Sequence, residues 1–192
     1  PGFYPEWPWK GTVIPDHGEV FTLPWDCRIL EDKIEMSVYG VRFPYKFTKV
    51  LELDENIVKI RYEMQNCCAV DFKYLWSAHC MLAAEKGQKI FLPGNPRIRT
   101  DFSLNERFGK HLYETDWPDA KQADGKTVDL STVGDPQSRA ATKIFTSALD
   151  QGRCGLQNPE TGDCLEMTFD PAETPFVGVW INEGGVFEEG EN

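Results

Sequence analysis

The stretch "IVKIRYEMQN", residues 57–66, alternates apolar and polar side chains with a period of two. Successive side chains of a β-strand point to opposite faces of the sheet, so this alternation predicts a strand with one buried face. The face expected in the core carries Val58, Ile60, Tyr62 and Met64. The other face carries charged and amide side chains, which is typical of an antiparallel sheet with one side in water.

The same period recurs along the chain. It is found in "KIEMSVYG" and "RFPYKFTKVLEL", and further short strands are expected at "QKIFLP", "CLEMTFD" and "PFVGVWIN". Turn sequences such as "LDEN" and "NPETGD" separate these strands. Only "SRAATKIFTSALD" has the length of a helix, and its Thr and Ser residues disfavour one. The sequence therefore predicts an all-β, antiparallel fold.

The length of 192 residues suits one domain with a core of its own, and we predict a single β-sandwich over residues 1–192. Residues 94–140 lack clean periodicity and are rich in Gly, Pro, Asp and Asn. We expect this segment to form long loops or an insertion, because excursions of this kind are usually functional loops. The chain begins with Pro1 rather than Met, and we expect it to be part of a longer product.

The charge balance argues against a nucleic-acid partner. Thirty-one acidic residues outnumber twenty basic ones, for a net charge of -11, and the basic residues form no cluster that could replace phosphate counterions. No stretch reaches the ~18 consecutive apolar residues of a membrane span, and the start does not resemble a signal peptide. We therefore expect a soluble, cytoplasmic protein without a membrane partner.

The six cysteines include the adjacent pair Cys67 and Cys68 but no Cys-x-x-Cys motif. We expect buried free thiols, because a chain of this length does not need disulfide bonds. An alternative is a disulfide between Cys154 and Cys164, which flank a turn and could face each other across two strands. No spacing of His and Cys matches a zinc motif, so no metal site is predicted.

Three histidines are candidates for acid/base chemistry. His17 follows a proline in "IPDHGEVFTLPW", in a loop entering a strand, and His79 lies in the otherwise apolar "YLWSAHCML". A strand through residues 74–83 would turn His79 to the same face as Leu75 and Ser77. A partly buried imidazole can donate and recover a proton near neutral pH, although a purely structural hydrogen bond is the commoner role for a lone histidine. His111, in the aperiodic segment, is expected to be a solvated loop residue.

The ordered series of segments resembles a known superfamily. The series is "IPDHGEVFTLPW", "LDENIVKIRYEMQN", "YLWSAHCML" with "KIFLP", "TGDCLEMTFDP" and "PFVGVWINEGGV". As a set covering most of the chain, it is similar to the galactose mutarotase-like superfamily, in particular to bacterial aldose 1-epimerase-like proteins. The resemblance implies an antiparallel β-supersandwich with a sugar groove on one sheet, of which this chain would be a part.

The resemblance also implies a reaction, the interconversion of the α and β anomers of a free aldose. A glutamate takes the proton of the C1 hydroxyl while a histidine protonates the ring oxygen, and neither a metal nor a cofactor is needed. By position, His79 matches the general acid. The matching sugar contacts are His17, Trp76 and Asn182.

The chain departs from the family pattern at the catalytic base. That glutamate lies in a strand beyond the Trp-x-Asn segment, and Glu183, although it follows Asn182, does not stand in its motif. We therefore assign no base, and Asp119 of "WPD" is only a candidate for the sugar-binding aspartate. Two functions stay open: an aldose 1-epimerase-like isomerase, and a non-catalytic carbohydrate-binding β-sandwich domain that lacks the base. The sequence indicates neither the sugar nor the oligomeric state.

Overall fold

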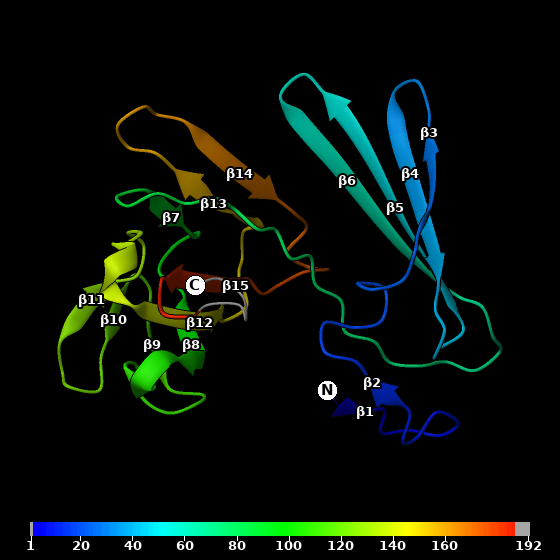
Figure 1. The fold of residues 1–192 in the computed structure, drawn as a ribbon, viewed down its shortest axis with the longest axis horizontal. Helices are drawn as coiled ribbons and strands as arrows, with labels where there is room; N and C mark the ends of the chain where they lie inside the picture. Colours follow the sequence, from blue (N-terminus) through cyan, green and yellow to red (C-terminus); the bar gives the residue numbers. More distant parts are fainter. Residues whose placement is uncertain (1, 187–192) are drawn as a thin grey trace. The chain divides into compact units, whose positions relative to one another are not determined.

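Antiparallel strands supply the regular structure of the chain in this computed structural model, which describes residues 2–186 (Figure 1). Every pairing between named strands is antiparallel, and the helical elements of the described residues are two short 3-10 turns, η1 (Leu104–Glu106) and η2 (Pro136–Ser138). The all-β prediction is confirmed. Within residues 2–186, no helix combines the length and apolar character needed to cross a membrane.

The chain folds as two compact units, Pro1–Ala78 (unit 1) and His79–Asn192 (unit 2). Each unit has sheets of its own, and the prediction of one sandwich domain over residues 1–192 stays a prediction.

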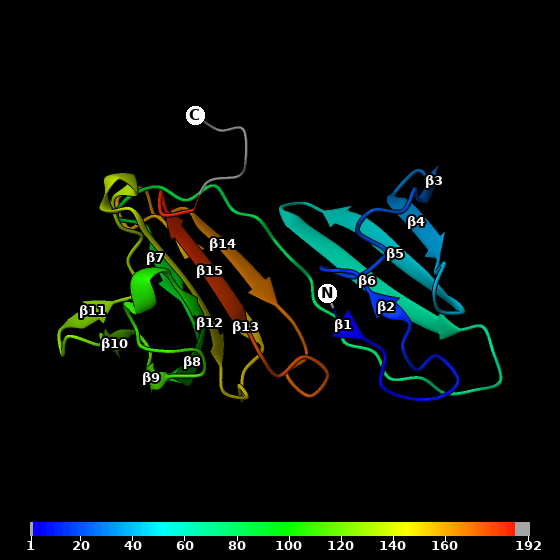
Figure 2. The same ribbon diagram turned by 60° about the horizontal axis from the view of Figure 1, so that its bottom comes forward.

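Unit 1 is built on a four-stranded sheet with the order β3-β4-β5-β6, which Figure 2 shows with its strands side by side. Its strands are β3 (Asp26–Ile29), β4 (Lys33–Tyr39), β5 (Tyr45–Asp54) and β6 (Ile57–Asn66). A two-stranded sheet of β1 (Gly2–Phe3) and β2 (Val13–Ile14) precedes it. The strands expected in "KIEMSVYG", "RFPYKFTKVLEL" and "IVKIRYEMQN" are confirmed.

One row of apolar side chains crosses three strands of this sheet. The register places Val38 of β4 opposite Phe47 of β5, and Phe47 opposite Met64 of β6. Val38 and Phe47 are buried, and the Phe47 ring stacks on Tyr62 with 6.0 Å between centroids. Trp25 meets Phe47 edge-on at 5.8 Å, so an aromatic layer covers this row.

The prediction that the whole apolar face of β6 is buried is wrong. Val58 is 57% exposed and Ile60 is 42% exposed, while Tyr62 and Met64 are partly buried. Val58 and Ile60 pair with residues near the tip of the β5–β6 hairpin, beyond the reach of the aromatic layer. Alternation shows that a strand has an apolar face, but a face is buried only where a second layer covers it.

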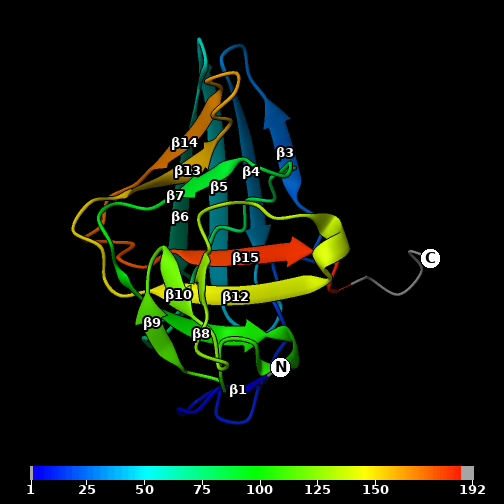
Figure 3. The ribbon, with the colours of Figure 1, turned by 90° about the vertical axis from the view of Figure 1, so that its left-hand side faces the viewer.

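Unit 2 contains a four-stranded sheet with the order β15-β12-β8-β9, and Figure 3 shows β15, β12 and β8 side by side. These strands are β8 (Arg97–Ser103), β9 (Glu114–Asp116), β12 (Ala140–Thr146) and β15 (Gly178–Glu183). A three-stranded sheet consists of β7 (Lys89–Phe91), β13 (Arg153–Gln157) and β14 (Cys164–Thr168), and a hairpin joins β10 (Asp119–Lys121) to β11 (Thr127–Asp129). The strands expected near "QKIFLP", "CLEMTFD" and "PFVGVWIN" are present.

The core of unit 2 draws most of its side chains from the segment that was expected to be long loops. The buried apolar cluster consists of Leu92, Ile98, Phe108, Trp117, Ala120, Leu130, Ile144 and Cys154. Five of these eight side chains come from residues 94–140, which also provide β8 to β11. The segment shows no sequence period because its core side chains sit singly between turns rather than along one long strand.

The cysteines are free thiols as expected, but most of them are not buried. Cys154 faces Met167 across the β13–β14 pair and Cys164 faces Gln157, so the proposed disulfide does not form. All six cysteines are free thiols, but only Cys154 is buried. Burial raises the pKa of the Cys154 thiol to about 11, with smaller contributions from the charges of Cys80 and Glu166. Cys154 is therefore an inert core thiol at neutral pH.

Candidate functional site

The segment that carries His79 is not a strand. Residues 71–85 have no regular secondary structure, Leu75 is fully exposed and His79 is exposed. The predicted strand through residues 74–83 is wrong because none of these residues pairs with a neighbouring strand in the described chain. Trp76 differs from the other residues of 74–83 in being partly buried. The centroid of its ring lies 4.8 Å from that of Tyr62.

His17 lies in a tight turn with an uncommon backbone conformation. Its φ angle is 60°, and that of Gly18 is 76°, so two successive residues are left-handed. The turn is closed by the Gly18 N–H, which donates to the Pro15 carbonyl at 3.1 Å. The exposed imidazole lies 3.6 Å from Asp16 and 5.9 Å from the Phe21 ring. A non-glycine residue held in this region is a recurrent feature of functional sites.

Glu19, two residues after His17, is a buried carboxylate that sequence reasoning missed. Its side chain is 4% exposed, and Oε2 accepts the backbone N–H of Arg42 at 2.9 Å. Tyr45 lies beside it: burial, and then the negative charge of Glu19 and a hydrogen bond to it, raise the pKa of the Tyr45 phenol well above its usual range. Nothing in the sequence around Glu19, which follows a histidine and a glycine, indicates that its side chain is buried.

Asn182 is committed to the backbone of the turn that follows β15. Its Oδ1 accepts the N–H groups of Gly185 and Val186, each at 3.1 Å, and its Nδ2 donates to the Val186 carbonyl at 2.7 Å. These bonds use the carboxamide as a cap for the turn. A sugar contact by Asn182 would have to share these groups, and it stays a prediction.

The remaining sequence candidates occupy ordinary surface positions. His111 is exposed in a turn, where Nδ1 lies 3.0 Å from the Asp101 carbonyl, so its predicted place in a solvated loop is confirmed. Asp119 is exposed at the start of β10.

A cavity of about 300 Å³ lies in unit 2 against β11, β12 and β15. Its apolar lining includes Val128, Leu130, Ala140, Ala141 and Ile181, and its polar lining consists of Arg107, Asp129, Thr132, Thr142, Ser138 and Glu183, with the backbone of Gly134. None of the three histidines lines it. The lining comes from separate stretches of chain, and for this reason no local motif could identify it.

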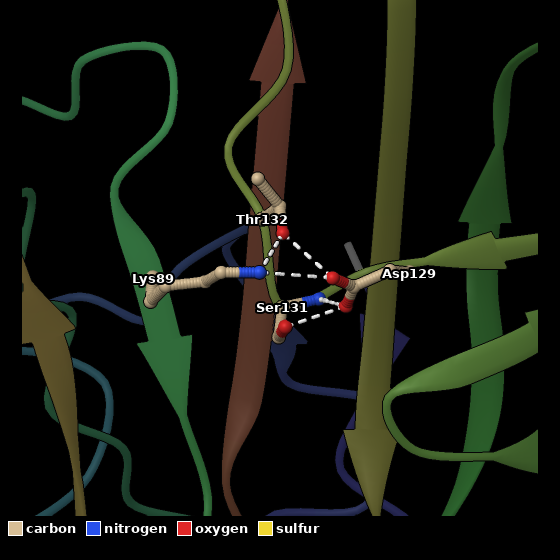
Figure 4. Close-up of polar contacts among 4 residues, drawn as sticks. All are labelled: Lys89, Asp129, Ser131 and Thr132. Carbon is tan, nitrogen blue, oxygen red and sulfur yellow. Dashed lines mark hydrogen bonds and ion pairs between the residues drawn. The ribbon is translucent and has the colours of Figure 1, made fainter. Parts of the chain in front are cut away.

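A hydrogen-bond network fixes one wall of the cavity (Figure 4). Asp129 accepts Lys89 Nζ at 3.0 Å, the Thr132 hydroxyl at 2.6 Å and the Ser131 N–H at 2.8 Å, and Lys89 also contacts Thr132. Burial raises the pKa of Asp129, but the bonds from Ser131, Thr132 and Lys89 outweigh burial and lower the pKa well below its usual range. The network therefore stabilises the fold above the ordinary aspartate pKa, and that contribution is lost as the pH falls toward the lowered value.

Glu183 fixes another part of the cavity lining. Its Oε1 accepts the Gly134 N–H at 2.7 Å and its Oε2 accepts the Ser138 hydroxyl at 3.1 Å. A Cβ on Gly134 would lie 2.4 Å from Oε1, so the carboxylate packs directly on the backbone there. Both oxygens thus organise the loop between β11 and β12.

The four residues implied by the resemblance fall into two pairs, His17 and Trp76 in unit 1, and His79 and Asn182 in unit 2. Among the described residues, no hydrogen bond or ring contact joins the members of either pair. That His17 and His79 serve one sugar groove, as the resemblance implies, stays a prediction. Comparisons of the chain with family models, curated proteins and solved structures find no match.

Proposed function

We propose that this chain is an aldose 1-epimerase-like carbohydrate isomerase that interconverts sugar anomers by acid/base catalysis, within a galactose mutarotase-like supersandwich. The observation that carries the proposal is the His17 turn. An imidazole stands there in an uncommon backbone conformation, next to a buried carboxylate, in the segment where the resemblance implies sugar contact. The quoted segments also contain β6, β7, β14 and β15, as an antiparallel fold requires.

In the proposed reaction, His79 donates a proton to the ring oxygen of a free aldose and recovers it on ring closure. Its exposure gives the imidazole access to a small solute. The chain carries no assigned base, and a positioned acid or base is worth roughly 10²–10⁴-fold in rate. We therefore expect these 192 residues to be a weak or inactive catalyst.

Replacing His79 by asparagine is expected to abolish the acceleration that the chain gives. The imidazole is the proposed proton donor, and an amide cannot titrate near neutral pH. Polarimetry on freshly dissolved α-glucose or α-galactose measures the rate, which should fall roughly 10²-fold or to that of buffer. His111→Asn is the matched control, because His111 is also exposed in unit 2. Equal rates for the unmodified chain and His79→Asn would refute the catalytic role.

The cavity of unit 2 favours the second function, a non-catalytic carbohydrate-binding domain. A pyranose ring has apolar C–H faces and a rim of hydroxyl groups, and the cavity joins an apolar lining to carboxylates, hydroxyls and a guanidinium. Its volume of about 300 Å³ suits a ligand of monosaccharide size. None of the three histidines lines it, so this site lacks the imidazole that the proposed reaction uses as its acid.

Ala140→Leu is expected to weaken sugar binding at this cavity by roughly tenfold, because three added carbons would occupy space that a ring needs. Calorimetric titration with glucose and with galactose measures the affinity. Ala123→Leu makes the same change at an exposed position of unit 2 outside the lining. Unchanged affinity in Ala140→Leu would place any bound sugar elsewhere, whereas binding without accelerated mutarotation would favour the non-catalytic function.

A further inference from the structure

We propose that Glu19 is a positioning residue that fixes the His17–Gly18 turn and thereby the direction of the His17 imidazole. The placement of the turn is a property of unit 1 alone. Only the consequence for a sugar rests on the proposed function.

The turn is not held by the side chain of His17 itself. The imidazole contacts Asp16 and Phe21, and all three side chains are exposed. Two successive left-handed residues are nevertheless kept in place, and such a conformation persists only where surrounding structure determines it. The Gly18 N–H bond to the Pro15 carbonyl closes the turn, and a neighbouring anchor would fix its direction.

Glu19 supplies that anchor at both its side chain and its backbone. Oε2 accepts the Arg42 N–H at 2.9 Å and the Arg42 guanidinium at 3.4 Å, which ties the segment to the turn between β4 and β5. The Glu19 carbonyl accepts the N–H and the hydroxyl of Thr22, at 3.3 and 3.4 Å. The chain is thus fixed immediately after Gly18, so the direction in which His17 leaves the turn is fixed as well.

The carboxylate fits closely against the β4–β5 turn. A Cβ on Gly40 would lie 2.8 Å from Glu19 Oε1 and 2.6 Å from the Tyr45 ring. Oε1 is inaccessible to solvent, and the Tyr45 phenol lies beside the carboxylate. Burying a carboxylate in this way is unfavourable for folding, so its presence argues for a role other than general stability.

The same burial argues against direct chemistry by Glu19, whose side chain is only 4% exposed. An oxygen without access to solvent cannot take a proton from a sugar hydroxyl in this conformation. Glu19 therefore acts through the backbone that it shares with His17.

The test uses the full chain and reads the histidine ring signals by NMR, with the His17 signal assigned from His17→Asn. Glu19→Ala removes both bonds to Arg42, and we expect the His17 signal to move while the signals of His79 and His111 stay in place. Glu19→Gln keeps an acceptor of the same size and should restore much of the original signal. Glu6→Gln, which breaks an exposed ion pair with Lys73 in the same unit, is the control and should move none of them.

An unmoved His17 signal in folded Glu19→Ala would overturn the proposal. Where Glu19→Ala does not fold, Arg42→Met takes its place, because it removes only the guanidinium contact and should move the same signal by a smaller amount; an unmoved signal there also overturns the proposal.

Sugar affinity separates this proposal from the proposed function. Misplacing a contact group is expected to weaken the binding of glucose or galactose roughly tenfold or more. A displaced His17 with unchanged affinity would support the positioning role and refute the sugar contact. Weakened affinity with an unmoved His17 would refute the positioning role.

Discussion

Replacing Phe108 by alanine is expected to lower the free energy of unfolding of unit 2 by about 3–5 kcal/mol. Phe108 is 1% exposed and is among the largest fully buried side chains. It packs in the core cluster that includes Trp117 and Ile144, which come from different segments. Its backbone is also fixed, because the Phe108 N–H donates to the Ser103 hydroxyl at 3.2 Å, so the surroundings cannot easily collapse into the space left behind.

Urea unfolding of the variant and the unmodified chain measures this loss. Phe176→Ala is the matched control in the same unit, because Phe176 is 57% exposed and its truncation should change stability by about 0.5 kcal/mol or less. If both variants lost the same small amount of unfolding free energy, the Phe108 side chain would not contribute to the stability of the core as its burial indicates.

The regular strands could be predicted from the sequence because they follow from local alternation. Residues 57–66 form β6 over the predicted range, since a period of two suits only an extended chain. Burial could not be predicted in the same way. Val58 and Tyr62 belong to the same apolar face, yet only Tyr62 lies under an aromatic neighbour from another segment.

Phe108 illustrates what local patterns miss. It follows η1 in a segment rich in turn residues, and the neighbours that bury it are distant in sequence. His79 shows the converse error, because its flanking apolar residues predicted a strand that has no partner to pair with. Both errors have one cause: a residue's environment is set by segments that its own neighbours in sequence do not reveal.

The candidate site was predictable only in part for a related reason. The loop position of His17 followed from its proline and glycine neighbours, and the structure confirms a turn there. The burial of Glu19 depends on Arg42 and on the absence of a side chain at Gly40, which belong to another segment. A glutamate is normally exposed, and its neighbours in the sequence give no indication of burial.

Gly40→Ala is expected to destabilise unit 1 by about 3 kcal/mol, the upper part of the range for overpacking. The added Cβ would lie 2.3 Å from the Phe43 carbonyl oxygen, 2.6 Å from the Tyr45 ring and 2.8 Å from Glu19 Oε1. Gly40 is not among the residues with positive φ, so the cost comes from lack of space and not from backbone strain. Since the Phe43 atom belongs to the backbone, a rotamer change cannot relieve the contact.

Urea unfolding and the His17 ring signal test this prediction together. Gly2→Ala is the control, because a Cβ there meets nothing within 4 Å and Gly2 also lies in unit 1. We expect Gly40→Ala to lower stability and to move the His17 signal, because the displaced carboxylate is the anchor of the His17–Gly18 turn. A loss of stability with an unmoved His17 signal would mean that the crowding at Gly40 does not reach the turn through Glu19. If Gly40→Ala were as stable as Gly2→Ala, the β4–β5 turn would be able to accommodate the added Cβ despite these short distances.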